Sequence, residues 1–416
     1  MNNLSLQIKD KIGGNVVLPI SKSLCNRNLI LKYLSNNHLS PELSKAKDSE
    51  VLSEALKNYK NQDIIDIGLA GTAMRFLTSF LCLKTEKEIV LKGNKRMNER
   101  PVADLVNALR NLGAKISYLE NEGFPPLKIS PSKLKGKEIW MNENVSSQFI
   151  SSIMMIAPIL ENGLSIKFEN KPISFPYILM TKSAMEKAGA KIKISNDGKS
   201  IKILSENYNI NFDYLNEKDW SAASYFFSIA ATVEFDELIF EGLSLPSTQG
   251  DSEIVNVFQK YFGISFLNKE NSISIKKSSK SELSESIEIN CIDIPDMAQT
   301  FAFLMATNKI KGKLSGLQTL VNKETNRITA IINELSKINV ETESDGKNYI
   351  SLVSFGEFPD KKVLFRTYDD HRMAMSLVPI LLKNCKYLLE DYTVVEKSFP
   401  NFWEELGNFG IEINLV

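Results

Sequence analysis

Histidine and cysteine are scarce in this chain, and their scarcity narrows the chemistry that it can perform. The 416 residues include only two histidines and four cysteines. Two histidines exclude a histidine-rich metal site, and the widely spaced cysteines form no CxxC pair. We expect all four to be reduced and mostly buried thiols, as in a cytoplasmic protein. They are Cys25, Cys82, Cys291 and Cys385.

Net charge and long apolar runs are also lacking. Fifty basic residues cancel fifty acidic ones, which argues against a general nucleic-acid binder. No apolar run reaches the ~18 residues of a membrane helix, and the first ten residues lack the basic and apolar segments of a signal peptide. We therefore expect a cytoplasmic protein with no nucleic-acid or membrane partner. The 43% hydrophobic content predicts globular domains, two or three at this length.

One sequence block recurs along the chain: a helix, a small stop residue, a short strand, a polar turn and a second short strand. Its stop residues lie 71–76 residues apart, at Gly113, Gly189, Gly263, Asn339 and Gly410. Each is placed where a helix ends in a left-handed residue, a conformation that glycine and asparagine tolerate. The pairs at 197–198 and 345–346, both Asp-Gly, predict hairpin turns. Repetition with this period predicts a few large α/β units rather than a solenoid.

A second set of helices starts with residues that cap well. The predicted starts lie at 21–23, 71–72, 146–148, 219–221, 251–252, 296 and 370–371. Simple capping explains such residues. The alternative is that several of these helix N-termini offer backbone N–H groups to anions in one cleft.

Clusters of charged and hydroxyl side chains suggest anion binding. In the first half they are Ser21-Lys22-Ser23 with Arg27, Gly71 before a helix, Arg100 before a proline, and Ser146-Ser147-Gln148. In the second half they are Asp296, Lys323, Glu324, Arg327, Arg372 and Lys397. The cations suit phosphate and carboxylate groups, and Asp296 and Glu324 are candidates for proton transfer. Either carboxylate could instead be a helix cap or an ion-pair partner.

Together these motifs resemble one family, the 5-enolpyruvylshikimate-3-phosphate synthases (3-phosphoshikimate 1-carboxyvinyltransferases). In order along the chain the motifs are SKSxxNR (21–27), AGTAMR (70–75), RMxERP (96–101), SSQF (146–149), QGD (249–251), IPD (294–296), KETxR (323–327), DHRMAM (370–375) and KxFP (397–400). The chain departs from the family pattern at Leu69 and Phe76, where asparagine and proline are usual.

The resemblance implies an α/β fold of two similar lobes, each made of three repeated units with helices packed inside β-sheets. It also implies transfer of the enolpyruvyl group of phosphoenolpyruvate to the 5-hydroxyl of shikimate 3-phosphate, with release of phosphate. No cofactor or metal is implied, and we expect a monomer. Asp296, Glu324 and Lys22 are the implied catalytic groups.

The resemblance also implies the substrate contacts. Those to shikimate 3-phosphate are Lys22, Ser23, Arg27, Ser146, Ser147, Gln148, Ser174, Tyr177, Asp296 and Lys323. Those to phosphoenolpyruvate are Lys22, Gly71, Arg100, Gln148, Arg327, Arg372 and Lys397.

Two alternatives are weighed against this function. A related enolpyruvyl transferase acts on UDP-N-acetylglucosamine, but its signatures are a Lys-Asn pair at the first helix and a loop cysteine. Here the pair is Lys22-Ser23, and Cys82 lies in a helical pattern. An inactive homologue that serves as a binding module would lack Asp296, Glu324 or the arginines, all of which are present. Repeat symmetry places the first lobe at residues 20–218 and the second at 1–19 plus 219–416, with the active site expected in the cleft between them.

Overall fold

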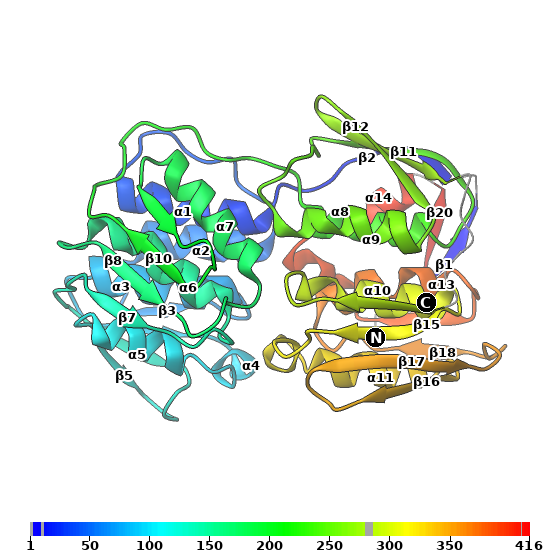
Figure 1. Ribbon diagram of the computed structural model, residues 1–416. Helices are drawn as coiled ribbons and strands as arrows, with labels where there is room; N and C mark the ends of the chain where they lie inside the picture. The colour runs from blue at the N-terminus through cyan, green and yellow to red at the C-terminus, as the bar shows by residue number, and fades with distance from the viewer. Residues whose placement is uncertain (1–2, 10–11, 279–285, 409) are drawn as a thin grey trace. The chain divides into compact units, whose positions relative to one another are not determined.

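The chain divides into two compact units (Figure 1). The computed structural model describes residues 3–9, 12–278, 286–408 and 410–416. We call Ile20–Asn216 the central unit, and Met1–Pro19 together with Glu217–Val416 the terminal unit. The chain therefore leaves the terminal unit after Pro19 and returns to it at Glu217, whereas the repeat spacing places the return after residue 218.

Two four-stranded sheets belong to the central unit. The first has the order β3-β4-β6-β5, with bounds Ile64–Asp66, Ile89–Lys92, Leu127–Ser130 and Lys115–Tyr118. The second has the order β7-β8-β10-β9, with bounds Glu138–Trp140, Leu164–Lys167, Ser200–Ile203 and Ile192–Ile194. Helices α1 (Lys22–Ser35) and α2 (Lys47–Asn58) precede both sheets.

Three four-stranded sheets belong to the terminal unit. One has the order β12-β13-β11-β2, with bounds Ile264–Lys269, Ser272–Lys277, Phe235–Glu241 and Ile12–Val16. Another has the order β14-β15-β17-β16, with bounds Ser286–Asn290, Lys311–Ser315, Tyr349–Phe355 and Val340–Ser344. The third has the order β18-β19-β1-β20, with bounds Val363–Phe365, Tyr387–Glu390, Asn3–Ile8 and Ile411–Leu415.

The five sheets found among the described residues share one pattern of strand directions. In each, one parallel pair, such as β3 with β4 or β14 with β15, is extended by two antiparallel pairings. In the third sheet of the terminal unit, β1 lies between β19 and β20. In a sheet such as β3-β4-β6-β5, the corresponding inner position belongs to the second strand of a hairpin, β6. In another, β2 runs parallel to β11, and the whole central unit lies between them in sequence. The shared pattern confirms an α/β fold built from repeated units.

Helices connect and cover the strands. The remaining ones in the central unit are α3 (Gly71–Lys84), α4 (Lys95–Asn98), α5 (Ala103–Asn111), α6 (Ser147–Ile156), the 3-10 turn η1 (Ala157–Ile159) and α7 (Phe175–Lys187). The terminal unit has α8 (Trp220–Ala230), α9 (Ile254–Tyr261), α10 (Ala298–Thr307), α11 (Arg327–Ser336), α12 (His371–Ser376), α13 (Val378–Leu381) and α14 (Phe402–Asn408). Its 3-10 turns are η2 (Gly250–Glu253), η3 (Pro295–Met297), η4 (Leu320–Asn322) and η5 (Tyr392–Lys397).

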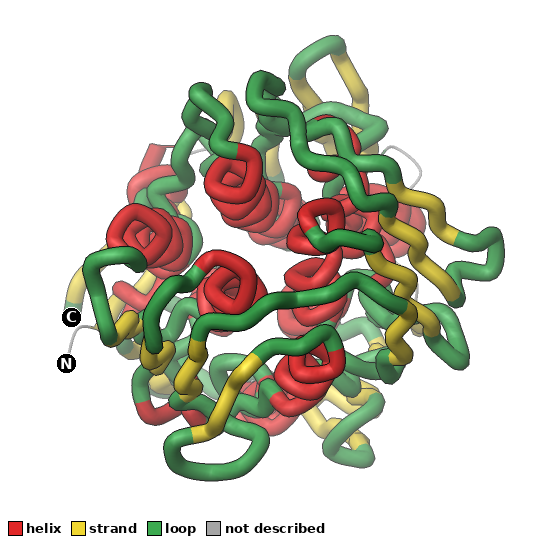
Figure 2. The backbone as a smooth tube through the Cα atoms, turned by 90° about the vertical axis from the view of Figure 1, so that its left-hand side faces the viewer, coloured by secondary structure: helices red, strands yellow, loops and turns green. Residues whose placement is uncertain are grey.

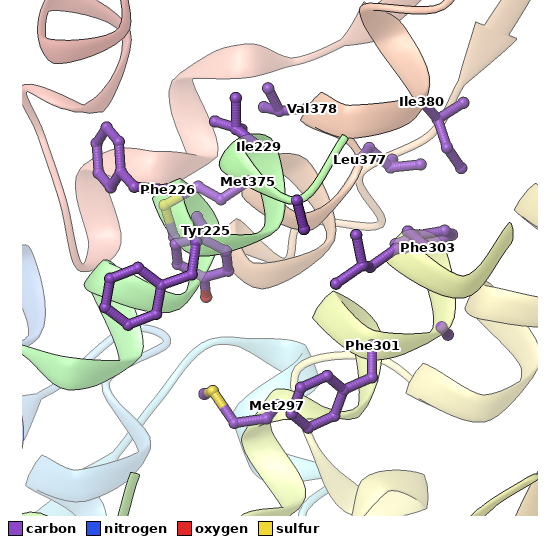
Figure 3. Close-up of a cluster of buried hydrophobic side chains, with 14 of the residues drawn as sticks. Tyr225, Phe226, Ile229, Met297, Phe301, Phe303, Met375, Leu377, Val378 and Ile380 are labelled. Atoms are coloured by element: carbon purple, nitrogen blue, oxygen red, sulfur yellow. The ribbon is translucent and has the colours of Figure 1, made fainter. Parts of the chain in front are cut away.

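Helices, rather than a sheet pair, form the middle of the terminal unit's core. All of α10, and all of α8 except the partly exposed Ser221, is buried, as expected for helices that are apolar on all sides. Figure 3 shows Tyr225, Phe226 and Ile229 of α8 near Met375 of α12, with Phe301 of α10 beside Met297. The central unit has its own core, made only of residues from 25 to 212. Several helices are viewed along their axes in Figure 2, with strands toward the outside.

The predicted helix stops adopt the expected backbone. All five have positive φ: 106° at Gly113, 95° at Gly189, 63° at Gly263, 57° at Asn339 and 100° at Gly410. Both predicted Asp-Gly hairpins are also present, joining β9 to β10 and β16 to β17. The prediction of these turns from sequence is therefore confirmed.

Two of the predicted helix starts are wrong. Asp251 lies inside η2 and Asp296 inside η3, so the α-helices that follow begin only at Ile254 and Ala298. Neither α9 nor α10 has a side-chain cap hydrogen bond. The carboxylate of Asp296 does not cap a helix, and its partners are side chains.

Candidate active site

Asp296 lies within reach of three cations in the terminal unit. Its Oδ1 accepts hydrogen bonds from Lys323 Nζ at 2.9 Å and from Arg327 Nη1 at 2.8 Å. Its Oδ2 is 3.2 Å from Arg372 Nη2. The 3-10 turn η3 presents the carboxylate, while the lysine directly follows η4 and the first arginine begins α11. Three cations on one carboxylate make an ionised Asp296 the stable form here.

Arg327 connects this carboxylate to two others. It is the first residue of α11, whose N-cap Asn326 accepts a hydrogen bond from Thr329 N. Its Nε donates to Asp370 Oδ2 at 2.7 Å, and its Nη2 donates to Glu324 Oε2 at 3.1 Å. The side chain is only 2% exposed, so the three carboxylates replace the water that a guanidinium would otherwise bind.

Glu324 forms the end of the network. Besides Arg327, its carboxylate accepts a hydrogen bond from Lys397 Nζ at 2.7 Å. Lys397 is the last residue of η5. Glu324 and Lys397 side chains are 11% and 10% exposed, so both groups can exchange a proton with a bound ligand without being open to bulk water.

The charges in this network shift one another's pKa values. Burial alone would raise the pKa of Asp296, but Arg372, Lys323 and Arg327 outweigh burial and hold it well below 3.8. Burial lowers the pKa of Lys323 despite the favourable Asp296 charge. Burial would also lower the pKa of Arg327, yet Asp370, Glu324 and Asp296 raise it. Asp296 is therefore ionised, and the cations around it keep their charge in position for anions.

Arg372 is oriented by groups that the sequence motifs do not single out. Its Nη1 donates to Tyr225 Oη at 3.2 Å, and its Nη2 donates to Ser221 Oγ at 3.4 Å. The Ser221 hydroxyl in turn donates to Asp251 Oδ2. The sequence marks Ser221 only as part of one predicted helix start, and Asp251 as part of another predicted start and of the QGD motif. A serine and a carboxylate at two helix starts carry no sequence signal that they meet.

In the central unit, Arg27 is held by protein groups on three sides. Its Nε donates to Thr181 Oγ1 at 2.7 Å, and its other nitrogens donate to the carbonyl oxygens of Ser23 and Tyr177 at 2.8 and 3.2 Å. Its guanidinium carbon lies 5.6 Å from the centre of the Phe76 ring. Burial lowers the pKa of Arg27 to about 10, so it keeps its charge near neutral pH. The departure from the family pattern at Phe76 thus places a ring against this arginine.

Gly71 opens α3 beside two arginines. A Cβ added at Gly71 would lie 2.8 Å from Nη1 of both Arg75 and Arg100. Arg75 Nη1 also donates to the Gly71 carbonyl oxygen at 2.9 Å. Two guanidinium groups thus fill the space beside Gly71 at the start of one helix, and a side chain there would have to displace them.

The remaining predicted residues of the central unit lie at helix starts. Lys22, the first residue of α1, donates to Asp48 Oδ2 at 3.0 Å. Ser146 caps α6 by accepting from Gln148 N, and Gln148 Nε2 donates to Thr72 Oγ1 at 3.2 Å. Ser147 is the first residue of α6, and Ser174, with a φ of 54°, precedes α7. Hydroxyl, amide and cationic groups thus gather at the N-termini of α1, α3, α6 and α7.

Comparison with known proteins identifies the family. A family model for EPSP synthase (3-phosphoshikimate 1-carboxyvinyltransferase) matches residues 37–406. A relative from Bacteroides fragilis, named 3-phosphoshikimate 1-carboxyvinyltransferase, is 38% identical over 98% of both chains. The chain belongs to the EPSP synthase family. A relative of the same name from Buchnera aphidicola subsp. Cinara cedri is 35% identical over 97% of this chain and 96% of its own.

Solved structures show the same fold. The EPSP synthase from Acinetobacter baumannii superposes with a TM-score of 0.73 at 19% identity, covering 99% of both chains. The enolpyruvyl transferase NikO from Streptomyces tendae gives a TM-score of 0.74 at 12% identity, covering 100% of this chain and 99% of that one. The enolpyruvyl transferase-like fold class that the motifs implied is confirmed.

The EPSP synthase family fold brings the predicted residues together within each unit. In the terminal unit, one network joins Asp296, Lys323, Glu324, Arg327, Arg372 and Lys397. No group of three or more histidine, cysteine, aspartate or glutamate side chains suited to a metal occurs among the described residues. Within that part of the chain, no helix combines the length and apolarity needed to cross a membrane.

Proposed function

We propose that this protein transfers the enolpyruvyl group of phosphoenolpyruvate to the 5-hydroxyl of shikimate 3-phosphate and releases phosphate, in the pathway to chorismate and the aromatic amino acids. The observation that carries the proposal is the terminal unit's network of four cations and three carboxylates in a chain of zero net charge. Both substrates are anions with a phosphate and a carboxylate, so a neutral protein must concentrate its cations locally to bind them.

The reaction balances with the groups present. The 5-hydroxyl adds to C2 of phosphoenolpyruvate, its proton passes to Asp296, and C3 gains a proton from Glu324 or Lys22. The resulting tetrahedral adduct loses a C3 proton as its C–O bond to phosphate breaks, which leaves the enolpyruvyl ether and inorganic phosphate. Bound anions would draw Lys323, Arg327 and Arg372 away from Asp296. Its pKa would then rise toward the range in which a carboxylate accepts a proton.

We assign the two substrates to different cations. Arg100, Arg327, Arg372 and Lys397 bind phosphoenolpyruvate, with Gly71 leaving room at the start of α3, and Lys22 and Gln148 touch both substrates. Ser23, Arg27, Ser146, Ser147, Ser174, Tyr177, Asp296 and Lys323 bind shikimate 3-phosphate. The supporting contacts are the acceptors that hold the buried Arg27 and the paired guanidiniums beside Gly71.

The coarser organisation follows the same proposal. We expect each unit to be built on three repeats. Because both units supply groups to a single reaction, we also expect the active site to use the cleft between the two lobes. The protein acts as a cytoplasmic monomer. The reaction needs no cofactor or metal, because phosphoenolpyruvate brings its own activated leaving group.

Phosphate release tests the proposed function. The purified protein is mixed with shikimate 3-phosphate and phosphoenolpyruvate, and each substrate is omitted in turn. We expect phosphate and the enolpyruvyl ether in equal amounts, and only when both substrates are present. Release with UDP-N-acetylglucosamine instead would favour the related transferase, and binding of both substrates without release would favour an inactive homologue.

A further inference from the structure

Glu334 is a buried carboxylate that the proposed reaction does not use. Its side chain is fully buried on α11, two turns after Arg327 on the same helix. It accepts hydrogen bonds from Lys337 Nζ at 2.6 Å, from the Arg366 backbone N–H at 3.0 Å and from Tyr368 Oη at 2.7 Å. Two of these three donors lie in the segment that joins β18 to α12.

That segment has an unusual backbone. Tyr368 and Asp369 both have left-handed conformations, with φ of 56° and 55°. Consecutive non-glycine residues seldom adopt this region, and an aromatic residue has none of the local side-chain hydrogen bonds that make it easier for aspartate. Such a turn persists where its surroundings hold it. The Tyr368 hydroxyl and the Arg366 amide are two points at which Glu334 holds it.

The turn leads directly to the phosphoenolpyruvate side of the proposed site. Asp370 follows it, is fully buried and accepts hydrogen bonds from Arg327 Nε and Nη2 at 2.7 and 3.2 Å. The same carboxylate caps α12 by accepting from Arg372 N at 2.9 Å. Arg327 and Glu334 thus fasten one helix, α11, to both ends of the 366–370 segment. The position of Arg372 therefore depends on how this segment is held, because Asp370 accepts a hydrogen bond from its backbone N–H.

We propose that Glu334 is a positioning residue that holds the left-handed turn at 368–369 and so fixes Asp370 and Arg372 for phosphoenolpyruvate. This inference rests on the proposed function, in which Arg372 contacts that substrate. Lys337 supports the arrangement from the other side, since its Nζ also donates to the Leu364 carbonyl oxygen of β18 at 2.8 Å. Burial and the Glu334 carboxylate also raise the pKa of Tyr368 to about 12, so its hydroxyl keeps the proton that it donates.

Tyr368→Phe tests the inference with the least disturbance, because it removes one hydroxyl and keeps the ring. We expect KM for phosphoenolpyruvate to rise about tenfold, since a displacement near 1 Å of a substrate-positioning group can cost up to about 100-fold. KM for shikimate 3-phosphate and kcat should stay within about twofold of the wild type. Glu334→Gln should act in the same direction. Tyr387→Phe is the matched control, because that buried hydroxyl donates to the Pro359 carbonyl oxygen, away from the turn.

A second measurement does not depend on catalysis. Hydrogen exchange at the Arg366 and Arg372 amides should be faster in Tyr368→Phe and Glu334→Gln than in the wild type and in Tyr387→Phe. Adding Asp369→Gly to Tyr368→Phe should restore part of the phosphoenolpyruvate affinity, because glycine adopts a left-handed backbone without strain.

The outcomes separate the two proposals. An unchanged phosphoenolpyruvate KM in both variants, or an equal rise for both substrates, would overturn the positioning role. If the wild type releases no phosphate from these substrates, the proposed function fails and the effect on phosphoenolpyruvate falls with it. The exchange rates would then still show whether Glu334 holds the turn.

Discussion

At the scale of residues, the candidate site in the terminal unit depends on a few ionised side chains that contact one another. Asp296 meets three cations, and Arg327 meets three carboxylates while almost fully buried. Removing one partner from such a network leaves the others partly uncompensated. Each residue therefore affects both stability and anion binding, and substitutions that keep shape but remove charge are the most informative.

Asp296→Asn separates proton transfer from structure. If Asp296 accepts the hydroxyl proton, turnover should fall by about 10²–10⁴-fold, the usual worth of a general base. The lost charge should also cost about 1.5–3 kcal/mol of unfolding free energy, the range for hydrogen bonds to charged groups. Shikimate 3-phosphate should bind as tightly as before or more tightly, because the site becomes more positive. Steady-state kinetics, calorimetric binding and chemical denaturation give the three values.

Asp197→Asn is the control, because Asp197 lies in the β9–β10 hairpin turn, which asparagine also suits. It should leave turnover unchanged. Near-normal turnover in Asp296→Asn would contradict the mechanism, though not the family membership.

The depressed pKa of Asp296 predicts how stability depends on pH. A carboxyl whose folded pKa lies below its unfolded value near 3.9 stabilises the fold above about pH 4, and that contribution is lost as pH falls through the folded pKa. The difference in unfolding free energy between wild type and Asp296→Asn should thus be constant from about pH 5 to 7 and shrink below about pH 4. Denaturation at a series of pH values measures it. A difference that grew on acidification would refute the ion-pair explanation.

At the scale of elements, glycine and asparagine set where helices and hairpins end. The five stop residues and both Asp-Gly turns have the backbone that their sequence predicts. The two predicted helix starts that failed, at Asp251 and Asp296, lie in 3-10 turns. Residues of the capping type indicate that a helix begins nearby. They do not indicate whether the side chain will bond to the backbone of its own helix or to a side chain of another element.

A pair of glycine substitutions isolates the backbone cost. Gly346 has a φ of 75° and open space where a Cβ would lie, whereas Gly407 lies in α14, where an added methyl meets only Ile413 Cδ1 at 3.7 Å. Gly346→Ala should destabilise the protein by about 1–2 kcal/mol, the cost of a left-handed residue with a Cβ. Gly407→Ala should be neutral or stabilise by up to about 1 kcal/mol. Thermal and chemical unfolding compare the two, and equal effects would contradict the backbone argument.

At the scale of the molecule, the two units have separate cores. One core uses residues 25 to 212, and the other uses residues 4 to 18 and 220 to 411. The terminal unit depends on its first strand, because β1 pairs with both β19 and β20 and buries Leu4 and Leu6. Residues distant in sequence therefore complete one sheet.

Fragments test this dependence. Residues 20–216 alone should fold cooperatively, because their core is their own. Residues 217–416 alone should be destabilised by at least about 3–6 kcal/mol, the burial of Leu4 and Leu6 at ~1.5–3 kcal/mol each, because this fragment also loses Ile12, Val16 and Leu18 of the same core. A peptide of residues 1–19 should restore part of that stability. Circular dichroism melts of the fragments measure both effects. A fully stable 217–416 fragment would show that β1 is dispensable.

The sequence by itself determined the α/β class, the repeat, the helix stops and the family, because these follow from local backbone preferences and from motifs that are contiguous in the chain. Tertiary structure alone decided which charges meet. The contacts of Asp370 with Arg327, of Ser221 and Tyr225 with Arg372, and of Glu334 with the Arg366 amide span 32 to 151 residues of sequence. Strand pairing and helix packing set such distances, and no local spacing encodes them. For the same reason Asp296 could be read from sequence as a cap, whereas the fold surrounds it with three cations.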